Sequence, residues 1–378
     1  MSDGAIYLDC AATTPVDPRV SEVVVRYMVD EFGNAGSRTH EFGTRAQRAT
    51  EHARQQISEV VDADPAEVVF TSGATESNNL ALLGLASYGR SVGKLHIVTT
   101  AVEHKAVLEP LAVLAKRGFE IDFVAPTVSG AVRASDVLAR VRDDTLLVSV
   151  MQVNNETGIV QPIACIADGL ANTDAFLHTD SAQGFSKVDN LRHPRLDLIS
   201  ISGHKLFAPK GIGALIVRRR GRLRVPLEPL MFGGGQERGL RPGTLPVSLV
   251  AGLGAAAEFA RREAQSRAAR CLELRDQLMA ALEPLGPTIN GDPKLSVPHI
   301  INVSLPGVDS EAAILALRPV VAVSNGSACT SSRYEPSHVL RAMGLAEDRC
   351  RGAIRFSWSH ETPIPDVADV ASRLHQLL

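Results

Sequence analysis

The amino-acid sequence predicts an α/β protein with a large domain, built on a mainly parallel sheet, and a smaller C-terminal α+β domain. Short apolar runs rich in β-branched residues alternate with segments whose apolar residues recur at helical spacing. From about Leu249 the composition shifts to a long segment rich in Ala, Arg and Glu. The 378 residues, 45% of them hydrophobic, suffice for one large or two medium domains with a substantial core.

The large domain is expected to contain seven short strands. We place them at residues 67–71, 95–99, 121–124, 145–150, 175–178, 196–201 and 213–217, the last one antiparallel to its neighbours. Helical spacing predicts helices at 76–86 and 105–117. Short apolar strands separated by helices of this length are typical of crossover connections, which produce a parallel sheet covered on both faces.

The smaller domain is expected to follow a long helix that runs from about residue 249 to just before Pro284. Strands are predicted at 300–304, 320–323 and 353–357. Helices are predicted at 310–317, around 336–343 and at the C-terminus. This mixture of strands and helices indicates a separate α+β unit.

Composition excludes several function classes. The chain has 39 Lys and Arg against 42 Asp and Glu, a net charge of −3, so no general basic field favours nucleic acid. The N-terminus MSDGAIYLD lacks the pattern of a signal peptide, and no apolar run approaches 18 residues. The five cysteines, an odd number, show no C-x-x-C spacing, which argues against a zinc site or a disulfide framework. A reducing cytoplasm is the expected compartment.

Lys205 and a turn of small residues both follow predicted strands. Lysine at the end of a strand is usually a surface charge, but it can also be an amine that binds an aldehyde covalently. The turn 71–75, TSGAT, can be an ordinary helix start or, through its free backbone amides, a phosphate site. The chain has no Walker-type phosphate loop that could take this role instead. That motif, G-x-x-x-x-G-K, would need glycine five residues before Gly93-Lys94, and this position is Tyr88.

Asp180 and His104 follow two further strands. Asp180 can be a helix N-cap or can hold the protonated nitrogen of a pyridine ring, and His104 can be an idle helix residue or can stack on a planar cofactor. Four strand ends thus supply an amine, a phosphate site, a carboxylate and an imidazole. Pyridoxal phosphate requires all four functions.

The chain resembles the cysteine desulfurases of the class V aminotransferase group over nearly its full length. The resemblance rests on long motifs, among them YLDCAATTPVDPRV, FTSGATESNNLA, VNNETG, SGHK, RPGTLP, SNGSACTSS, EPSHVLRAMGL and IRFS. The SNGSACTS segment places it with the NifS- and IscS-like enzymes. The resemblance implies pyridoxal-phosphate fold type I with a seven-stranded sheet. We place the large domain at 15–255 and the small one, with the catalytic cysteine loop, at 1–14 and 256–378.

The resemblance also implies a role for each motif residue. Lys205 would bind the cofactor covalently, and Asp180 would pair with its pyridine nitrogen. His104 would stack on the ring and assist proton transfer. The other implied cofactor ligands are Ala74, Thr75, Asn155, Gln183, Ser202, His204 and, from the second subunit of a homodimer, Thr244. The implied ligands of the substrate carboxylate are Asn34 and Arg355, with Asn155 nearby; no metal is implied.

Cys329 is the decisive residue. Its neighbours in SNGSACTSS are small and polar, which indicates a loop and not a packed core. An idle loop thiol is the alternative to a nucleophile. Forming its thiolate at pH 7 costs about 2 kcal/mol, an amount that His104 or the cofactor site can offset. The resemblance implies that Cys329 attacks the sulfur of L-cysteine, keeps it as a persulfide and leaves L-alanine.

The sulfur acceptor is expected to be a protein. NAGSRTHEFG and MFGGGQERGLRPGTLP resemble the DndA-like branch, which supplies sulfur for DNA phosphorothioate modification. Iron–sulfur cluster assembly, tRNA thiolation, selenocysteine cleavage, transamination and a binding role without turnover are the alternatives. The cluster from Arg218 to Arg224 predicts a solvated hairpin, with docking of an acidic partner or nucleic acid as the second interpretation. Direct nucleic-acid binding is not supported, since no aromatic stripe accompanies the arginines.

Overall fold

The computed structural model describes residues 4–326 and 337–378, so Cys329 lies outside the described residues. Its main feature is a seven-stranded sheet with the order β2-β8-β7-β6-β5-β3-β4. The strands are β2 (Val68–Thr71), β3 (His96–Thr100), β4 (Glu120–Val124), β5 (Thr145–Ser149), β6 (Phe176–Asp180), β7 (Leu198–Ser202) and β8 (Gly213–Val217). All seven predicted strands are therefore present, with ends that differ by a few residues.

The sheet is mainly parallel, as predicted. Strands β4, β3, β5, β6 and β7 pair in parallel. Strand β8 is antiparallel to both of its neighbours, β7 and β2, which confirms the orientation expected for residues 213–217. The parallel strands consequently bring their carboxyl ends, and the loops that follow them, to one edge of the sheet.

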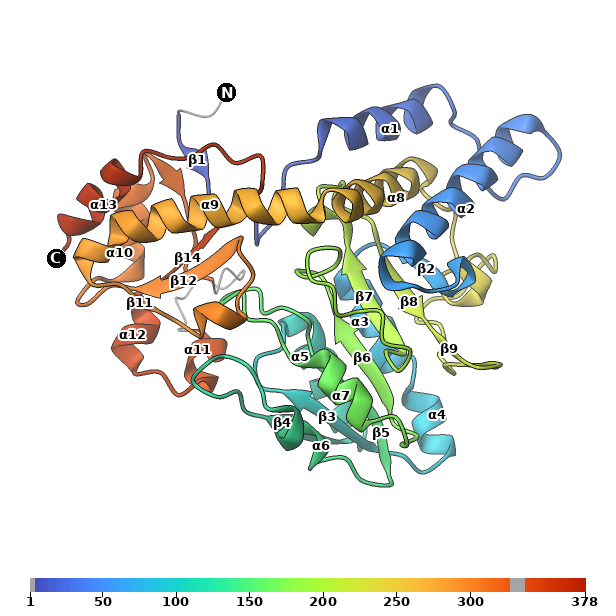
Figure 1. Ribbon diagram of the computed structural model, residues 1–378. Helices are drawn as coiled ribbons and strands as arrows, with labels where there is room; N and C mark the ends of the chain where they lie inside the picture. Colours follow the sequence, from blue (N-terminus) through green and yellow to red (C-terminus); the bar gives the residue numbers. More distant parts are fainter. Residues whose placement is uncertain (1–3, 327–336) are drawn as a thin grey trace.

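Helices cover both faces of the sheet (Figure 1). One face packs against α3 (Ala74–Leu83), α4 (Ala86–Ser91) and α5 (Lys105–Lys116). The opposite face packs against α1 (Pro18–Val29), α2 (Glu41–Val61), α6 (Ala134–Leu138), α7 (Ile163–Gly169) and α8 (Val247–Arg262). Successive strand residues alternate between the two cores, since Val69 and Leu215 join one, and Phe70 and Ala214 the other.

Helices α1 and α2 were not predicted. Helix α1 begins at Pro18 after the N-cap Asp17, whose side chain accepts a hydrogen bond from the backbone amide of Arg19. Proline is favoured at this first helical position, because its missing amide would have no partner there. Asp17-Pro18, within the quoted motif TTPVDPRV, was therefore a usable sequence signal.

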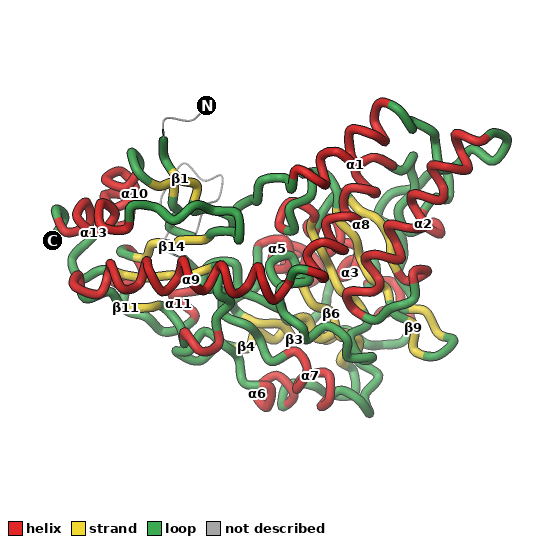
Figure 2. The backbone as a smooth tube through the Cα atoms, turned by 45° about the horizontal axis from the view of Figure 1, so that its top comes forward, coloured by secondary structure: helices red, strands yellow, loops and turns green. Residues whose placement is uncertain are grey.

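The long helix predicted from residue 249 is divided in two. Helix α8 ends at Arg262, and α9 (Ala264–Leu282) begins after Glu263, whose backbone leaves the helical range. The Glu263 carboxylate bonds the guanidinium groups of Arg19 and Arg267. Helix α9 extends away from the large sheet and lies along the second group of strands (Figure 2).

The C-terminal unit has its own sheet and core. Strands β11 (Thr288–Ile289), β12 (Ile300–Ser304) and β14 (Ala353–Ser357) are antiparallel, and β1 (Ile6–Tyr7) pairs in parallel with β13 (Val321–Ala322). Its helices are α10 (Ser310–Leu317), α11 (His338–Ala342), α12 (Glu347–Arg351) and α13 (Val367–His375). Leu8 and residues of α9 share its core, whereas α8 packs in the core of the large sheet.

Two smaller features complete the fold. Strands β9 (Arg219–Arg220) and β10 (Leu223–Arg224) form an antiparallel hairpin beyond the end of β8. In the described part of the chain, no helix combines the length and the apolar character that crossing a membrane requires.

Candidate active site

A cavity of about 1180 Å³ lies at the carboxyl edge of the large sheet. It is walled by the start of α3, by the loops that follow β3, β5, β6 and β7, and by Arg355 of β14. Ten of the residues implied by the resemblance line it: Ala74, Thr75, His104, Asn155, Asp180, Gln183, Ser202, His204, Lys205 and Arg355. Residues from both units of the fold thus meet at one place.

The start of α3 is suited to bind an anion. Its N-cap, Gly73, makes no side-chain cap hydrogen bond and has a φ of 152°, a conformation that other residues rarely adopt. The amides of the first helical turn therefore point outward without an intrahelical partner, and they favour a phosphate group. Ala74, Thr75 and Ser202 line the cavity at this point.

Asp180 ends β6 and is held on both carboxylate oxygens. Oδ2 accepts a hydrogen bond of 2.7 Å from Nδ2 of Asn78, and Oδ1 accepts one of 2.9 Å from the backbone amide of Ala182. Its exposed fraction is only 5%. A carboxylate fixed in this way presents negative charge in a constant direction, which suits the protonated nitrogen of a pyridine ring.

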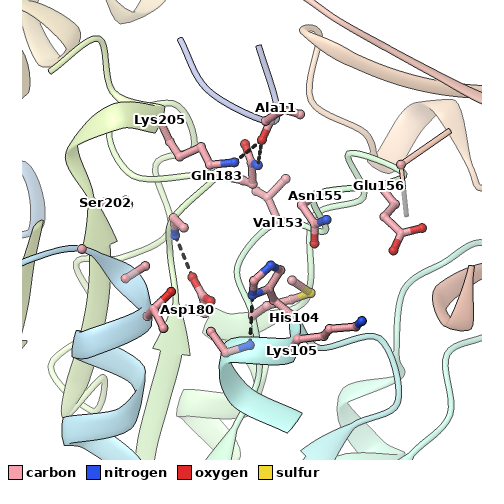
Figure 3. Close-up of a pocket in the computed structure, with 18 of the residues that line it drawn as sticks. Ala11, His104, Lys105, Val153, Asn155, Glu156, Asp180, Gln183, Ser202 and Lys205 are labelled. Carbon is pink, nitrogen blue, oxygen red and sulfur yellow. Dashed lines mark hydrogen bonds between the residues drawn. The ribbon is translucent and has the colours of Figure 1, made fainter. Parts of the chain in front are cut away.

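Lys205 follows β7 and points into the cavity (Figure 3). Its Nζ donates a hydrogen bond to the carbonyl oxygen of Ala11, which also accepts one of 2.8 Å from Nε2 of Gln183. Burial, and next the positive charge of Arg355, lower the pKa of Lys205 to about 7. A large fraction of this amine is therefore neutral near pH 7 and available as a nucleophile or a base.

His104 is the N-cap residue of α5. Its Nδ1 accepts a hydrogen bond of 3.1 Å from the backbone amide of Ala106, so in the neutral ring Nε2 carries the proton. Burial lowers the pKa of His104, which keeps the ring neutral at physiological pH. Figure 3 shows the imidazole among the cavity-lining side chains, on the side of Asn155.

Arg355 is buried, with an exposed fraction of 3%. Its Nη2 lies 2.6 Å from Oδ1 of Asp9, and Nη1 donates to the backbone carbonyl of Asn155 at 3.0 Å. The Nε atom is buried and has no hydrogen-bond partner among the described residues. Because Arg355 lines the cavity, its fixed guanidinium puts a positive charge where it could attract a substrate carboxylate.

Two implied site residues do not line this cavity. The Oδ1 of Asn34 accepts a hydrogen bond from the amide of Gly36, which ties it to its own exposed loop. Thr244 is exposed and does not line the cavity of its own subunit. Cys329 lies outside the described residues, but Gly326 and Ser337, which flank the segment 327–336, both line the cavity.

Four important residues were missed by sequence reasoning. They are Asn78, which holds Asp180; Asp9, which holds Arg355; and Glu156 and His338, which line the cavity. All four lie within motifs quoted above, namely FTSGATESNNLA, YLDCAATTPVDPRV, VNNETG and EPSHVLRAMGL. The motifs marked the right segments, but only the fold shows which side chains face the site.

The arginines of the basic segment from residue 218 to 224 have different environments, some buried and some exposed. Arg218 is buried, and its guanidinium donates to three backbone carbonyls. Arg220 bonds the buried carboxylate of Asp197. Only Arg222 and Arg224 are exposed, at the tip of the hairpin. The expected solvated hairpin is thus correct for the exposed arginines. It is wrong for Arg218, whose buried guanidinium bonds backbone carbonyls of two other segments of the chain.

These residues fit pyridoxal phosphate. The first turn of α3 would hold its phosphate, Asp180 its ring nitrogen, and Lys205 its aldehyde carbon. The fit is supported by the uncapped start of α3, by the fixed carboxylate of Asp180 and by the lowered pKa of Lys205. A ligand with a phosphate, a protonated ring nitrogen and an aldehyde would give each of these groups a partner.

Comparison with known proteins gives the same result. The model of the family "Aminotransferase class-V" matches residues 6–370. A cysteine desulfurase IscS of Klebsiella pneumoniae is 48% identical over 93% of this chain and 87% of its own length. The crystal structure of DndA from Streptomyces lividans is 54% identical, with a TM-score of 0.82, and covers 93% of this chain and 99% of its own.

A second solved structure, SspA in complex with cysteine, is 36% identical, has a TM-score of 0.84 and covers 95% of this chain and all of its own. The family match, the curated relatives and the sheet topology confirm the predicted fold type and the predicted cofactor. The chain belongs to the class V aminotransferase family of fold type I pyridoxal-phosphate enzymes and, within it, to the cysteine desulfurases.

Proposed function

We propose that this cysteine desulfurase takes sulfur from L-cysteine, holds it as a persulfide on Cys329 and passes it to a protein that modifies DNA with phosphorothioate. One observation carries the proposal: Gly326 and Ser337, at the two ends of the segment with Cys329, line the same cavity as Lys205, Asp180 and Arg355. The 54% identity to DndA and the cysteine named in the SspA structure support substrate and pathway.

The chain's own residues would divide the chemistry as follows. Arg355 binds the substrate carboxylate, and the neutral amine of Lys205 moves the proton at the substrate Cα. Asp180, fixed by Asn78, keeps a proton on the pyridine nitrogen. When bound, pyridoxal phosphate supplies the electron sink that makes the bond changes at the substrate carbons accessible.

Sulfur transfer then requires a thiolate. The sulfur of Cys329 attacks the substrate sulfur, a sulfur–sulfur bond forms, and the bond between the substrate's β-carbon and its sulfur breaks. The electron pair of the broken bond stays on the carbon, which takes up a proton. The overall change converts L-cysteine and one thiol into L-alanine and one persulfide, so no outside oxidant is required.

A homodimer and a cytoplasmic location complete the proposal. Thr244 would reach the cofactor of the partner subunit, and its exposure and its absence from its own cavity support this. Four described cysteines, Cys10, Cys165, Cys271 and Cys350, are free, which is typical of a reducing compartment.

Replacing Cys329 tests the chemistry. The Cys329→Ala variant is expected to keep the cofactor absorbance but to release no sulfide or alanine from L-cysteine, with Cys165→Ala, a change of another free thiol, as the control. Full activity of Cys329→Ala would overturn the proposal. Wild-type turnover of selenocysteine with no turnover of cysteine would favour the selenocysteine lyase alternative.

The acceptor is tested separately. Enzyme loaded from ³⁵S-cysteine is incubated with cell extract, and labelled proteins are identified by mass spectrometry. Label on a DNA-modification protein is the expected result. Label on an iron–sulfur scaffold or on a tRNA-thiolation protein instead would replace the proposed pathway, in line with the relatives named IscS.

A further inference from the structure

Three potential metal ligands lie together on β3 and β4, away from the active site. One ring nitrogen of His96 and one carboxylate oxygen each of Glu120 and Asp122 all lie within 4.8 Å of one another. His96 begins β3 and pairs with Glu120, the first residue of the edge strand β4. Glu120 and Asp122 are two positions apart, so their side chains leave the same face of the sheet. The cavity, by contrast, lies at the other, carboxyl end of the parallel strands.

His96 is fully buried, yet one of its ring nitrogens makes no hydrogen bond. Its Nδ1 lies 2.8 Å from the hydroxyl of Thr145, which also accepts a hydrogen bond from the backbone amide of Arg142. The Nε2 atom is buried and has no hydrogen-bond partner in the described part of the chain. It lies 3.6 Å from Oδ2 of Asp122, which is too far for a hydrogen bond. A buried polar atom without a partner is rare and requires an explanation.

The space between these two atoms fits a metal ion. Zinc binds an imidazole nitrogen at about 2.0–2.1 Å and a carboxylate oxygen at about 2.0–2.2 Å. Two such bonds that span 3.6 Å enclose an angle of about 120° at the metal, near that of a tetrahedral site. The Thr145 hydroxyl can accept the proton of Nδ1, which leaves the lone pair of Nε2 available to the metal. Histidine ligands of metals are usually held by such a second hydrogen bond.

Two arginines compete with a metal for the carboxylates. Arg142 bonds Glu120, and Nη1 of Arg140 lies 3.4 Å from Oδ2 of Asp122. Both arginines are exposed, and ion pairs at exposed positions add little to stability. Arg142 also bonds Asp144, so it keeps an acidic partner when Glu120 turns to a metal. Because Glu120 itself is exposed, an ion and its remaining water ligands can enter from solvent.

We propose that His96, Glu120 and Asp122 bind a divalent transition-metal ion of the Zn²⁺ class, with water as the fourth ligand. An imidazole nitrogen beside two carboxylates suits Zn²⁺, whereas Ca²⁺ and Mg²⁺ prefer oxygen ligands alone. The cluster contains no cysteine, so the cysteine spacing that argues against a thiolate zinc site does not bear on it. The ion fastens the edge strand β4 to β3. This proposal does not depend on the proposed function.

Titration calorimetry with Zn²⁺ tests the site. The holoenzyme is titrated in a Cys329→Ala background, so that zinc cannot bind the thiol of that residue. One Zn²⁺ ion per chain is expected to bind. The loss of an outer hydrogen-bond partner of a ligand costs about 10- to 100-fold in affinity, so Asp122→Asn, which changes a ligand itself, is expected to weaken binding at least about 10-fold. Asp143→Asn, at an exposed position just before β5, is the matched control and should bind Zn²⁺ like the parent enzyme.

X-ray absorption at the zinc edge identifies the ligands. Nitrogen and oxygen neighbours at about 2.0–2.2 Å, without sulfur, are expected. Glu120→Gln, another change at an exposed position, should reproduce the loss of affinity. The proposal would be overturned by the absence of zinc binding to the parent enzyme, or by equal affinity in the parent enzyme and both ligand variants. Sulfur neighbours at about 2.3 Å would also overturn it, because they would show that zinc binds cysteines instead.

Discussion

Asn78 is a buried amide that holds the carboxylate of Asp180 in a fixed direction. It is fully buried in α3, and its Nδ2 bonds the Asp180 carboxylate from the face of the sheet that α3 covers. Its own Oδ1 has no partner among the described residues. The contact links the helix that would bind the phosphate to the strand end that would bind the ring nitrogen, so both ends of the cofactor depend on one helix.

Replacing Asn78 by alanine is therefore expected to weaken cofactor binding. A hydrogen bond to a charged group contributes about 1.5–3 kcal/mol, and losing that much binding energy would raise the dissociation constant about 10- to 150-fold. Equilibrium dialysis of the variant against pyridoxal phosphate measures this. Asn79→Ala is the matched control, because the partly exposed Asn79 bonds the backbone carbonyl of Thr75 and not Asp180. An equal loss in both variants would contradict the specific role of Asn78.

At the scale of elements, three central strands share a buried polar chain. His178 of β6 has Nδ1 2.8 Å from the Ser149 hydroxyl of β5 and Nε2 3.1 Å from the Ser200 hydroxyl of β7. Burial lowers the pKa of His178 to about 4. A neutral imidazole therefore links the three central strands. When acid unfolds the protein, this imidazole becomes exposed and gains a proton.

This burial predicts acid sensitivity. Between pH 6.5 and about 4 the unfolded chain binds a proton at His178 and the folded chain does not, so the free energy of unfolding falls as the pH falls. The contribution of this group is roughly 3 kcal/mol over that interval. In urea unfolding at pH 6.5 and 4.5, His178→Gln is expected to lose less stability than the wild type does.

Burial also lowers the pKa values of His204 and His360 to about 4. The free energy of unfolding of the His178→Gln variant is therefore still expected to fall with pH, but less steeply than that of the wild type. His375→Gln, at an exposed site, serves as the comparison and should show the same dependence of the free energy of unfolding on pH as the wild type. If His178→Gln also showed the wild-type dependence, His178 would not contribute to it.

At the scale of the whole molecule, α1 presents an apolar surface to solvent. Val25, Met28 and Val29 lie three and four positions apart on this helix, and Phe32 follows, stacked on Phe42. All five side chains are exposed in the single chain. Exposed apolar side chains grouped on α1 and the segments next to it are typical of a surface that a second subunit covers.

The proposed homodimer predicts that Met28→Asp dissociates the enzyme. A charge buried without a partner in an interface costs several kcal/mol, enough to shift micromolar protein to monomer. Sedimentation velocity measures the shift, and desulfurase activity is expected to fall with it because Thr244, in the proposed dimer, would leave the partner's cavity. Val128→Asp, at an exposed apolar residue outside this surface, should stay dimeric. A dimeric Met28→Asp enzyme would exclude α1 from the interface.

The strands of the large sheet, and the site residues at their ends, were predictable from local sequence patterns. Strand ends carry Lys205, Asp180 and His104, and the parallel order of the strands brings them together without further information. Contacts between distant segments were not predictable in the same way. Nothing in the local sequence shows that the guanidinium of Arg218 is buried and bonds the carbonyls of Val61 and Leu191. At the break between α8 and α9, the carboxylate of Glu263 likewise bonds arginines from two helices, one of them 244 positions away.

The bond between Asp9 and Arg355 joins residues 346 positions apart. On a ribosome, the strands up to β8 emerge and can pair long before β14 has been made. At roughly 5–20 residues per second, the interval between them is on the order of ten seconds. During that time the nascent chain already carries Lys205 but has no arginine for a substrate carboxylate. The lysine therefore exists before the arginine that we propose for the substrate carboxylate, and the last strand to be synthesised sets the moment at which both are present in one site.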